Sequence, residues 1–213
     1  MSYSLLEMAT KGGWIMLVLL ILSIIAIYIF GKKVWMLTKA SKIDRYFMSD
    51  IQDLMNEGRI KGAKALCDKY DSPIARMTEK GIDFRKKSLQ EVQNAMENAG
   101  NVEIARLEKG LSGLASISGG APMIGFLGTV TGMIKAFFNM ANSGNNVDIA
   151  LLSGGIYEAM VTTVGGLIVG IIAYFAYNFL VGQVASLTAK MDSTVVDMVD
   201  ILEAMPADVE EKE

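Results

Sequence analysis

The polypeptide has 213 residues, 52% of them hydrophobic, with a mean hydropathy of +0.36 and a formal net charge of −3. This apolar share lies above the roughly 45–50% of soluble domains, so we expect a membrane protein rather than a soluble bundle of buried helices. The sequence has no histidine and no nucleotide-binding glycine motif, which excludes histidine-based catalysis, histidine-ligated metal sites and phosphate-binding loops. It has one cysteine, Cys67, which excludes a disulfide framework, and we expect neither a metal nor another cofactor.

Three windows of the sequence contain no Asp, Glu, Lys or Arg, and they cover residues 12–31, 110–134 and 159–189. Each window provides at least the roughly 20 residues that a helix needs to cross the hydrocarbon core of a membrane. The sequence therefore predicts an all-α membrane protein with three transmembrane helices. The first window is too long for the core of a signal peptide and no small-x-small cleavage site follows it, so we interpret it as an uncleaved anchor.

The segment between the first two windows, residues 32–112, has apolar residues at steps of three and four, which predicts several helices. Ser88 and Glu91 have the spacing of a capping box, so we expect a helix to begin there. We expect this helix to continue into the second transmembrane helix without a break. The mixed charges on its outer face indicate a solvated surface. The segment has no basic patch with interleaved aromatic residues, so we do not expect it to bind nucleic acid.

The distribution of basic residues indicates how the chain is oriented in the membrane. Sixteen of the twenty Lys and Arg residues lie between Lys32 and Lys109, whereas residues 136–157 have none. The positive-inside tendency places the basic segment in the cytoplasm. The predicted order is a periplasmic N-terminus 1–13, a transmembrane helix 14–31, a cytoplasmic helical region 32–112, a transmembrane helix 113–140, a periplasmic loop 141–155, a transmembrane helix 156–184, and a cytoplasmic helix with an acidic tail 185–213.

Small residues recur at steps of three and four in the second and third transmembrane helices. Such residues allow helix backbones to approach closely in lipid, so we expect both helices to pack against neighbours. The first transmembrane helix carries bulky, branched residues on all sides and is expected to face lipid. The expected packing residues are Gly125, Gly128, Gly132, Gly166 and Gly170.

Glu158 is the acid at the head of the last charge-free window. An acid costs about 2.5–3.5 kcal/mol at the centre of a membrane helix, and acids that persist there mark ion or proton paths. Thr162 and Thr163 follow four and five residues later, roughly on one stripe of a helix, and Thr129 and Thr131 can supply hydroxyls opposite. This set suits a proton better than a dehydrated metal ion, which needs about six oxygens. Because three helices cannot enclose a wet path, an oligomer or a second protein is required.

Each of these polar residues also has a purely structural interpretation. Threonine hydroxyls in membrane helices often bond to carbonyls of their own helix or link two helices. Glu158 would then cap the N-terminal end of the third helix at the outer interface, where a carboxylate is favourable.

Two stretches carry a resemblance to a known family: APMIGFLGTVTGMIKAF at 121–137 and YEAMVTTVGGLIVGIIAYFAYN at 157–178. They are similar to the two hallmark transmembrane helices of the MotA/TolQ/ExbB proton-channel family. The order of segments along nearly the whole chain matches too, and three transmembrane helices rather than four favour the ExbB/TolQ branch. The pathway positions that the resemblance implies are Glu158, Thr163 and Thr129, with Thr162 and Thr131 as weaker choices.

The resemblance implies a motor subunit of the bacterial inner membrane without enzyme activity. Members of the family form a ring, a pentamer in the better-understood cases, around two copies of a single-span partner of the ExbD/TolR type. Proton flow between ring and partner is expected to drive a rotation that energises TonB-dependent import of iron complexes and vitamin B12, with a TonB-like protein as a further partner. The Tol-Pal envelope system is the alternative, and the small-residue faces would line the ring seams and the central pore.

Two other classes of function are consistent with the residues. A passive membrane scaffold would hold the helix of a single-span partner without conducting protons, and it would tolerate the loss of Glu158. A secondary transporter for a small solute is disfavoured, because the sequence shows no inverted repeat and no substrate cage. The residues alone do not distinguish protons from sodium ions.

Overall fold

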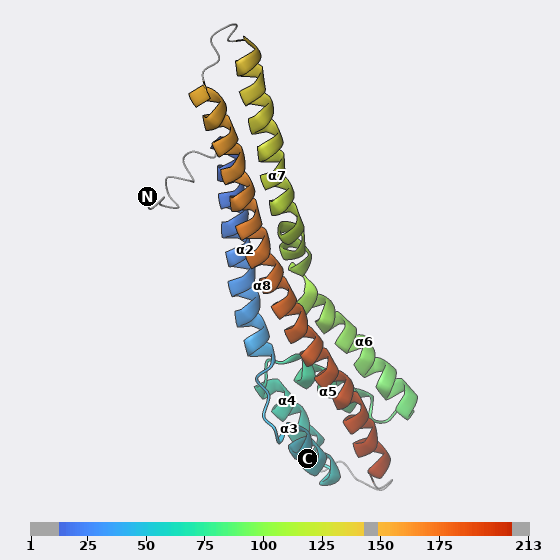
Figure 1. Cartoon of the computed structure of the whole chain (residues 1–213). Helices are drawn as coiled ribbons and strands as arrows, with labels where there is room; N and C mark the ends of the chain where they lie inside the picture. Colours follow the sequence, from blue (N-terminus) through green and yellow to red (C-terminus); the bar gives the residue numbers. More distant parts are fainter. Residues whose placement is uncertain (1–12, 143–148, 206–213) are drawn as a thin grey trace. The chain divides into compact units, whose positions relative to one another are not determined.

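The computed structural model describes residues 13–142 and 149–205, and the secondary-structure elements in these ranges are all α-helices (Figure 1). The segment before residue 13, residues 143–148 of the expected loop and the tail from 206 onward lie outside the described residues. The helices are α2 (Gly13–Ala40), α3 (Phe47–Asn56), α4 (Ile60–Lys69), α5 (Pro73–Phe84), α6 (Leu89–Glu108), α7 (Leu111–Asn142) and α8 (Ile149–Ala204).

The chain divides into two compact units, and the first contains the chain up to Gly31 together with Gly110–Leu180. It therefore holds the first part of α2, all of α7 and the first part of α8, which Figure 1 shows side by side. The stretches long and apolar enough to cross a membrane are Gly13–Ala40, Leu89–Asn142 and Leu152–Ala204. The predicted all-α architecture with three membrane-spanning helices is thus confirmed.

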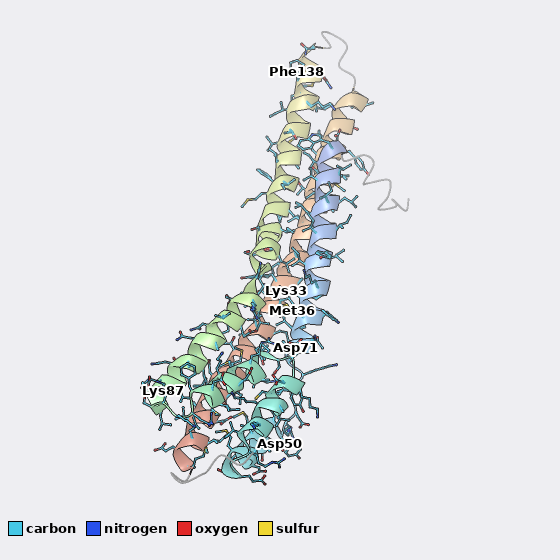
Figure 2. All side chains as sticks on the ribbon, turned by 180° about the vertical axis from the view of Figure 1, so that it is seen from behind. Lys33, Met36, Asp50, Asp71, Lys87 and Phe138 are labelled. Atoms are coloured by element: carbon cyan, nitrogen blue, oxygen red, sulfur yellow. The ribbon has the colours of Figure 1, made fainter. Side chains whose placement is uncertain are left out.

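The outer surfaces of this three-helix unit are apolar. Ile27 of α2, Phe126 and Phe138 of α7 and Phe175 of α8 each leave more than half of their surface exposed. Figure 2 marks Phe138 near the end of α7. Surfaces of this kind are favourable against lipid or against another protein, whereas in water they promote aggregation.

The second unit contains Lys32–Lys109 and the chain from Val181 onward, so it holds α3 to α6 and the last part of α8. Its core is rich in methionine around two glycines: a Cβ on Gly81 would lie 2.7 Å from a methionine sulfur, and a Cβ on Gly100 would lie 3.0 Å from a methionine methyl group. Methionine is flexible and fills irregular spaces of this kind. The methionines around these glycines are Met77 of α5, Met96 of α6, and Met191 and Met198 of α8.

Local sequence signals begin and end the helices of the second unit. α3 ends just before Gly58, whose φ of 76° lies in the left-handed region that favours glycine. Ser72 caps α5, because its hydroxyl accepts a hydrogen bond from the backbone N–H of Ala75 at 3.2 Å. The predicted capping box is confirmed: the Ser88 hydroxyl accepts from the Glu91 N–H at 3.3 Å, and the Ser88 N–H donates to the Glu91 carboxylate at 3.1 Å.

The expectation of an unbroken helix from Ser88 into the second transmembrane helix is wrong. α6 ends at Glu108 and α7 begins at Leu111. Between them Lys109 leaves the helical conformation, with a ψ of 118°, and Gly110 has a φ of 93°. A glycine in the left-handed region ends a helix at little cost, and the boundary between the two units falls at the same place.

α8 shows no such break and runs for 56 residues from Ile149 to Ala204. The apolar segment predicted at 156–184 and the amphipathic pattern predicted at 185–204 therefore belong to one helix. Glycines inside it do not interrupt it, because none of them has a positive φ, and several of them contact neighbouring helices, as described below.

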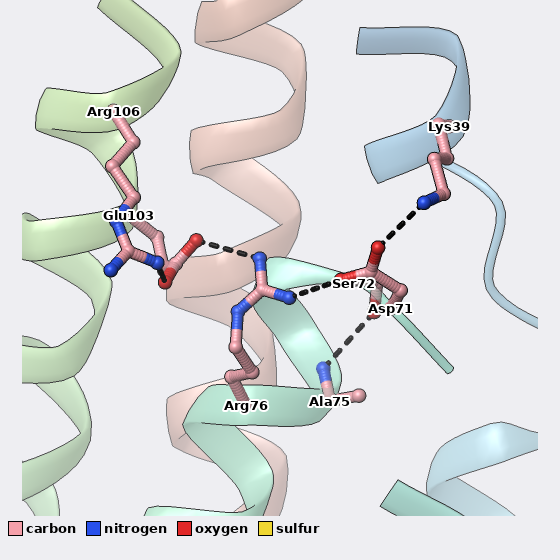
Figure 3. A network of polar contacts seen from close by, with 7 residues as sticks. All are labelled: Lys39, Asp71, Ser72, Ala75, Arg76, Glu103 and Arg106. Carbon is pink, nitrogen blue, oxygen red and sulfur yellow. Dashed lines mark hydrogen bonds and ion pairs between the residues drawn. The ribbon is translucent and has the colours of Figure 1, made fainter. Parts of the chain in front are cut away.

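A network of ion pairs fastens α2, α5 and α6 in the second unit (Figure 3). The Arg76 guanidinium donates to the carboxylates of Asp71 and Glu103, each at 2.7 Å. Arg106 donates to the other oxygen of Glu103 at 2.9 Å, and Lys39 donates to the other oxygen of Asp71 at 2.7 Å. Glu103 is buried whereas Asp71 is exposed, so the ion pairs of Glu103 are expected to contribute more to stability.

Replacement of Glu103 by glutamine is expected to lower the free energy of unfolding by about 1–3 kcal/mol. The amide removes the charge that faces two guanidinium groups, and it leaves Arg76 with one ionised partner. Thermal unfolding of the detergent-solubilised chain measures the effect, with Glu108→Gln at the exposed end of α6 as the matched control. Equal stability of the two variants would contradict this account of the network.

Asp71 gives the network a pH dependence. Hydrogen bonds from Lys39 and then Arg76 hold the pKa of Asp71 below its ordinary value of 3.8. Because the folded-state pKa lies below the unfolded-state pKa, ionised Asp71 stabilises the fold above pH 3.8, and this contribution is lost as the pH falls through the lowered value. The stability difference between the wild type and Asp71→Asn should be constant above about pH 5 and should vanish in stronger acid. It should be small, because Asp71 is exposed. A difference that persists at low pH would show that Asp71 acts by something other than its charge.

Candidate functional site

α7 and α8 of the first unit contact each other through glycines. A Cβ on Gly166 would lie 2.6 Å from the carbonyl oxygen of Ala121 and 2.9 Å from the Cα of Gly125, so no side chain fits there. The other expected packing glycines lie on the same contact: Gly128 against Thr162, Gly132 against Ala159, and Gly170 against Pro122. All five glycines thus pack between α7 and α8 of one chain, and their place at subunit seams or a pore stays a prediction.

The hydroxyls of Thr162 and Thr163 both point at one backbone carbonyl of α7. Thr163 donates to the carbonyl oxygen of Gly125 at 3.2 Å. Thr162 donates to the carbonyl oxygen of Ala159 in its own helix at 2.7 Å and lies 3.4 Å from the same Gly125 oxygen. Thr162 is 2% exposed, whereas Thr163 is half-buried at the edge of the contact. Thr163 therefore keeps access to the surface, and Thr162 does not.

The two threonines of α7 bond to their own helix. The Thr129 hydroxyl donates to the carbonyl oxygen of Phe126 at 2.6 Å, and the Thr131 hydroxyl donates to that of Leu127 at 2.9 Å. Thr129 follows Gly125 by four residues and thus lies about 40° around the helix from it, next to the carbonyl that Thr163 contacts. Thr131 lies about 120° from Gly125 and is exposed, so it is not part of this group.

Glu158 lies on the side of α8 that faces α2, whereas Thr162 and Thr163 lie on the side that faces α7. A Cβ on Gly13, the first residue of α2, would lie 2.6 Å from Oε1 of Glu158. Gly165, seven residues after Glu158 and so within about 20° of it around the helix, faces α2 as well. A Cβ on Gly165 would lie 2.9 Å from the sulfur of Met16. Glu158 is half-buried in this position.

The expectation that Glu158, Thr162 and Thr163 form one stripe needs correction. Five residues of α-helix turn through about 500°, so Glu158 and Thr163 point in directions about 140° apart. In the structure the first faces α2 and the second faces α7. Thr162 between them is sealed in the helix contact, so its hydroxyl serves packing and does not line an open path. Thr163 bonds to the carbonyl oxygen of Gly125, one turn of α7 before Thr129, whose hydroxyl bonds to its own helix.

An apolar groove with a cavity volume of about 410 Å³ lies between α2 and α8 in the first unit. Its lining runs from Ser23 to Phe30 on α2 and from Val169 to Phe179 on α8, and it includes no titratable side chain. A proton cannot be relayed along such a surface, so this groove is not the candidate path.

Other chemistry has little support in the described part of the chain. Within residues 13–142 and 149–205, no group of three or more His, Cys, Asp or Glu residues is placed to hold a metal ion. Cys67 is buried in the second unit, and this burial raises the pKa of its thiol to about 12. The thiol therefore stays protonated at neutral pH and is a poor nucleophile.

Sequence reasoning singled out the threonines and Glu158 but missed Gly13 as the neighbour of the acid. The contact joins the beginning of α2 to α8, residues 145 positions apart, so no local spacing indicates it. The separation of Glu158 from Thr163 was accessible from the sequence, because an interval of five residues does not return to the same face of a helix.

Residues 69–193 match the family described as the MotA/TolQ/ExbB proton channel family, whose members are channel subunits and not enzymes. A biopolymer transport protein ExbB homolog of Methanothermobacter thermautotrophicus is 29% identical over 85% of this chain and 64% of its own length. A biopolymer transport protein ExbB-like 1 of Synechocystis is 31% identical over 83% of this chain and 70% of its own length.

A third similar protein, the biopolymer transport protein ExbB of Neisseria gonorrhoeae, is 32% identical over 60% of this chain and 64% of its own length. The family match covers more than half of the chain, including α7 and most of α8. The chain, a multi-pass membrane protein, therefore belongs to the MotA/TolQ/ExbB proton channel family, closest to ExbB.

Proposed function

We propose that this chain is the ring-forming subunit of a proton-driven motor in the bacterial inner membrane, which acts with a single-span partner of the ExbD/TolR type. Family membership is the observation that carries the proposal, together with an ionisable residue, Glu158, in the third apolar helix. An acid in such a helix needs a watery cavity or a partner group, and a ring around the partner's helix supplies both.

The proposed pathway uses Glu158 as the group that binds and releases the proton, and Thr129 and Thr163 as hydroxyls that orient water along the wall. Glu158 and Thr163 face different helices, so one chain alone does not bring them together. The proposal therefore requires the assembly, in which neighbouring chains or the partner bridge the two sides of α8. We propose a pentamer with two partner copies, because that is the arrangement the family resemblance implies.

The orientation we propose has the N-terminus in the periplasm and the C-terminus in the cytoplasm. The sixteen basic residues between Lys32 and Lys109 support it, since basic segments stay on the cytoplasmic side. The work we propose for the motor is TonB-dependent import of iron complexes and vitamin B12 across the outer membrane. The names of the similar proteins, biopolymer transport protein ExbB, favour this over the Tol-Pal system, which is the second candidate.

Proton flux into proteoliposomes tests the proposal directly. The chain co-purified with its single-span partner should conduct protons when a membrane potential is applied, and the chain alone should not. Thr163→Val should reduce the flux, because it removes the hydroxyl at the edge of the α7–α8 contact. The matched control is Thr38→Val in α2, whose hydroxyl also bonds a backbone carbonyl. Equal flux with and without the partner, or no flux from the complex, would contradict the proposal.

A further inference from the structure

The carboxylate of Glu158 and the backbone of Gly13 share one small space at the beginning of α2. Oε1 of Glu158 lies 2.6 Å from the position that a Cβ of Gly13 would occupy. Gly13 also has a φ of 62°, a conformation that other residues rarely adopt. Two independent features, the space and the backbone angle, therefore require glycine at this position.

The contact belongs to a continuous packing of α2 along α8 in the first unit. Further along the two helices, Met16 and Leu19 lie against Gly165, and the ring of Phe30 lies 6.2 Å from the ring of Phe179. These contacts keep nearly the same offset between the two helices, so α2 runs parallel to α8 and presents its first residue to Glu158. The contacts of Met16, Leu19 and Phe30 with α8 thus fix the position of Gly13 relative to Glu158.

The beginning of a helix is a favourable place for a carboxylate. The first N–H groups of an α-helix have no acceptor inside the helix, and the helix dipole is positive at this end. The carboxylate of Glu158, which rests against the first residue of α2, therefore lies at a favourable end of the helix. A side chain at residue 13 would occupy the space of the Glu158 carboxylate, so the carboxylate would have to move away from the helix end.

We propose that Gly13 is a positioning residue for Glu158: by lacking a side chain it seats the carboxylate on the first turn of α2, where the acid takes up and releases the transported proton. The inference rests on the proposed function, since it assigns Gly13 a role only if Glu158 carries the proton. In this proposal α2 does more than face lipid, because its first residue positions the acid that carries the proton.

A double-mutant cycle in the co-purified complex tests the seat. Gly13→Ala should lower proton flux into proteoliposomes about tenfold, in the range by which groups in direct contact affect each other. Gly13→Asn should lower it as much, although asparagine tolerates a positive φ, because it places a Cβ at the same point. Gly31→Ala in the same helix should leave flux unchanged, since nothing lies within 4 Å of its Cβ.

A shorter acid at position 158 should relieve the effect of Gly13→Ala. Glu158→Asp withdraws the carboxylate by one methylene, so in that background Gly13→Ala should cost less than about twofold. The carboxyl band of residue 158 in infrared difference spectra, identified by its loss in Glu158→Gln, should shift in Gly13→Ala and stay in place in Gly31→Ala. A role of Gly13 in folding alone would lower flux equally in both backgrounds and leave the band unmoved, which would overturn the inference.

The outcomes also separate this inference from the proposed function. If Glu158→Gln abolishes flux and Gly13→Ala behaves like the wild type, the positioning role is wrong and the proton role of Glu158 stands. If Glu158→Gln keeps wild-type flux, the proposed function fails and the positioning role fails with it.

Discussion

Replacement of Glu158 by glutamine is expected to reduce partner-dependent proton flux by about a hundredfold or more, the contribution that a single positioned proton-transfer group makes. Glutamine has nearly the same shape as glutamate but cannot bind and release a proton near neutral pH. The half-buried position against Gly13 is retained, so the fold and the assembly should persist. A pH-sensitive dye inside proteoliposomes, with an imposed potassium diffusion potential, measures the flux.

The control for this experiment is Glu203→Gln, an exposed acid near the end of the same helix, which should conduct like the wild type. Assembly of each variant is checked by the amount of partner that co-purifies. A Glu158→Gln complex that assembles and still conducts would show that a group other than Glu158 carries the proton.

The second large effect is expected from Gly166→Ala, which should destabilise the contact between α7 and α8 by about 1–3 kcal/mol, the usual cost of overpacking. The added Cβ would lie 2.6 Å from the Ala121 carbonyl oxygen and 2.9 Å from the Cα of Gly125. Both are backbone atoms, so neither can rotate away as a side chain would. The two helices must separate, or the variant must unfold at lower temperature.

Gly182→Ala is the matched control, because it lies in the same helix and its Cβ would meet nothing within 4 Å. Alanine favours a helix over glycine by about 0.8–1 kcal/mol, so this control should unfold at the same temperature as the wild type or slightly above it. Thermal unfolding in detergent, followed by tryptophan fluorescence, compares the two. Equal unfolding temperatures for Gly166→Ala and Gly182→Ala would show that the glycine contact does not hold α7 to α8.

The architecture was largely predictable because its signals are local. Charge-free windows of sufficient length gave the three membrane-spanning helices, and the Ser88–Glu91 spacing gave the start of α6. The break at Gly110 was missed, because a glycine inside a helical pattern is tolerated in many contexts and only its φ of 93° shows that it ends a helix here.

The candidate site was predictable only in its residue types. An acid followed by hydroxyls in an apolar helix indicates a proton path, but which side of α8 each group faces depends on where α2 and α7 pack. Those contacts place Glu158 against Gly13 and Thr163 against the Gly125 carbonyl, and they seal Thr162 between two helices. Packing between distant segments decided each of these outcomes.

The glycines of α7 and α8 also show that the sequence does not identify which helix a residue contacts. Steps of three and four correctly indicate a face that packs closely, but they do not identify the neighbour. Gly125, Gly128 and Gly132 contact α8 of the same chain, so they are already used before any ring forms. The exposed apolar faces carry residues such as Phe126 and Phe175, and these faces would be available to the proposed ring.

Native mass spectrometry of the complex, purified in mild detergent with the single-span partner co-expressed, tests whether this chain forms a ring around the partner. We expect a ring of five copies of this chain that holds two copies of the partner. A monomer or dimer that ignores the partner, under conditions in which the helices remain folded, would contradict the claim that this chain is the ring subunit of a proton-driven motor.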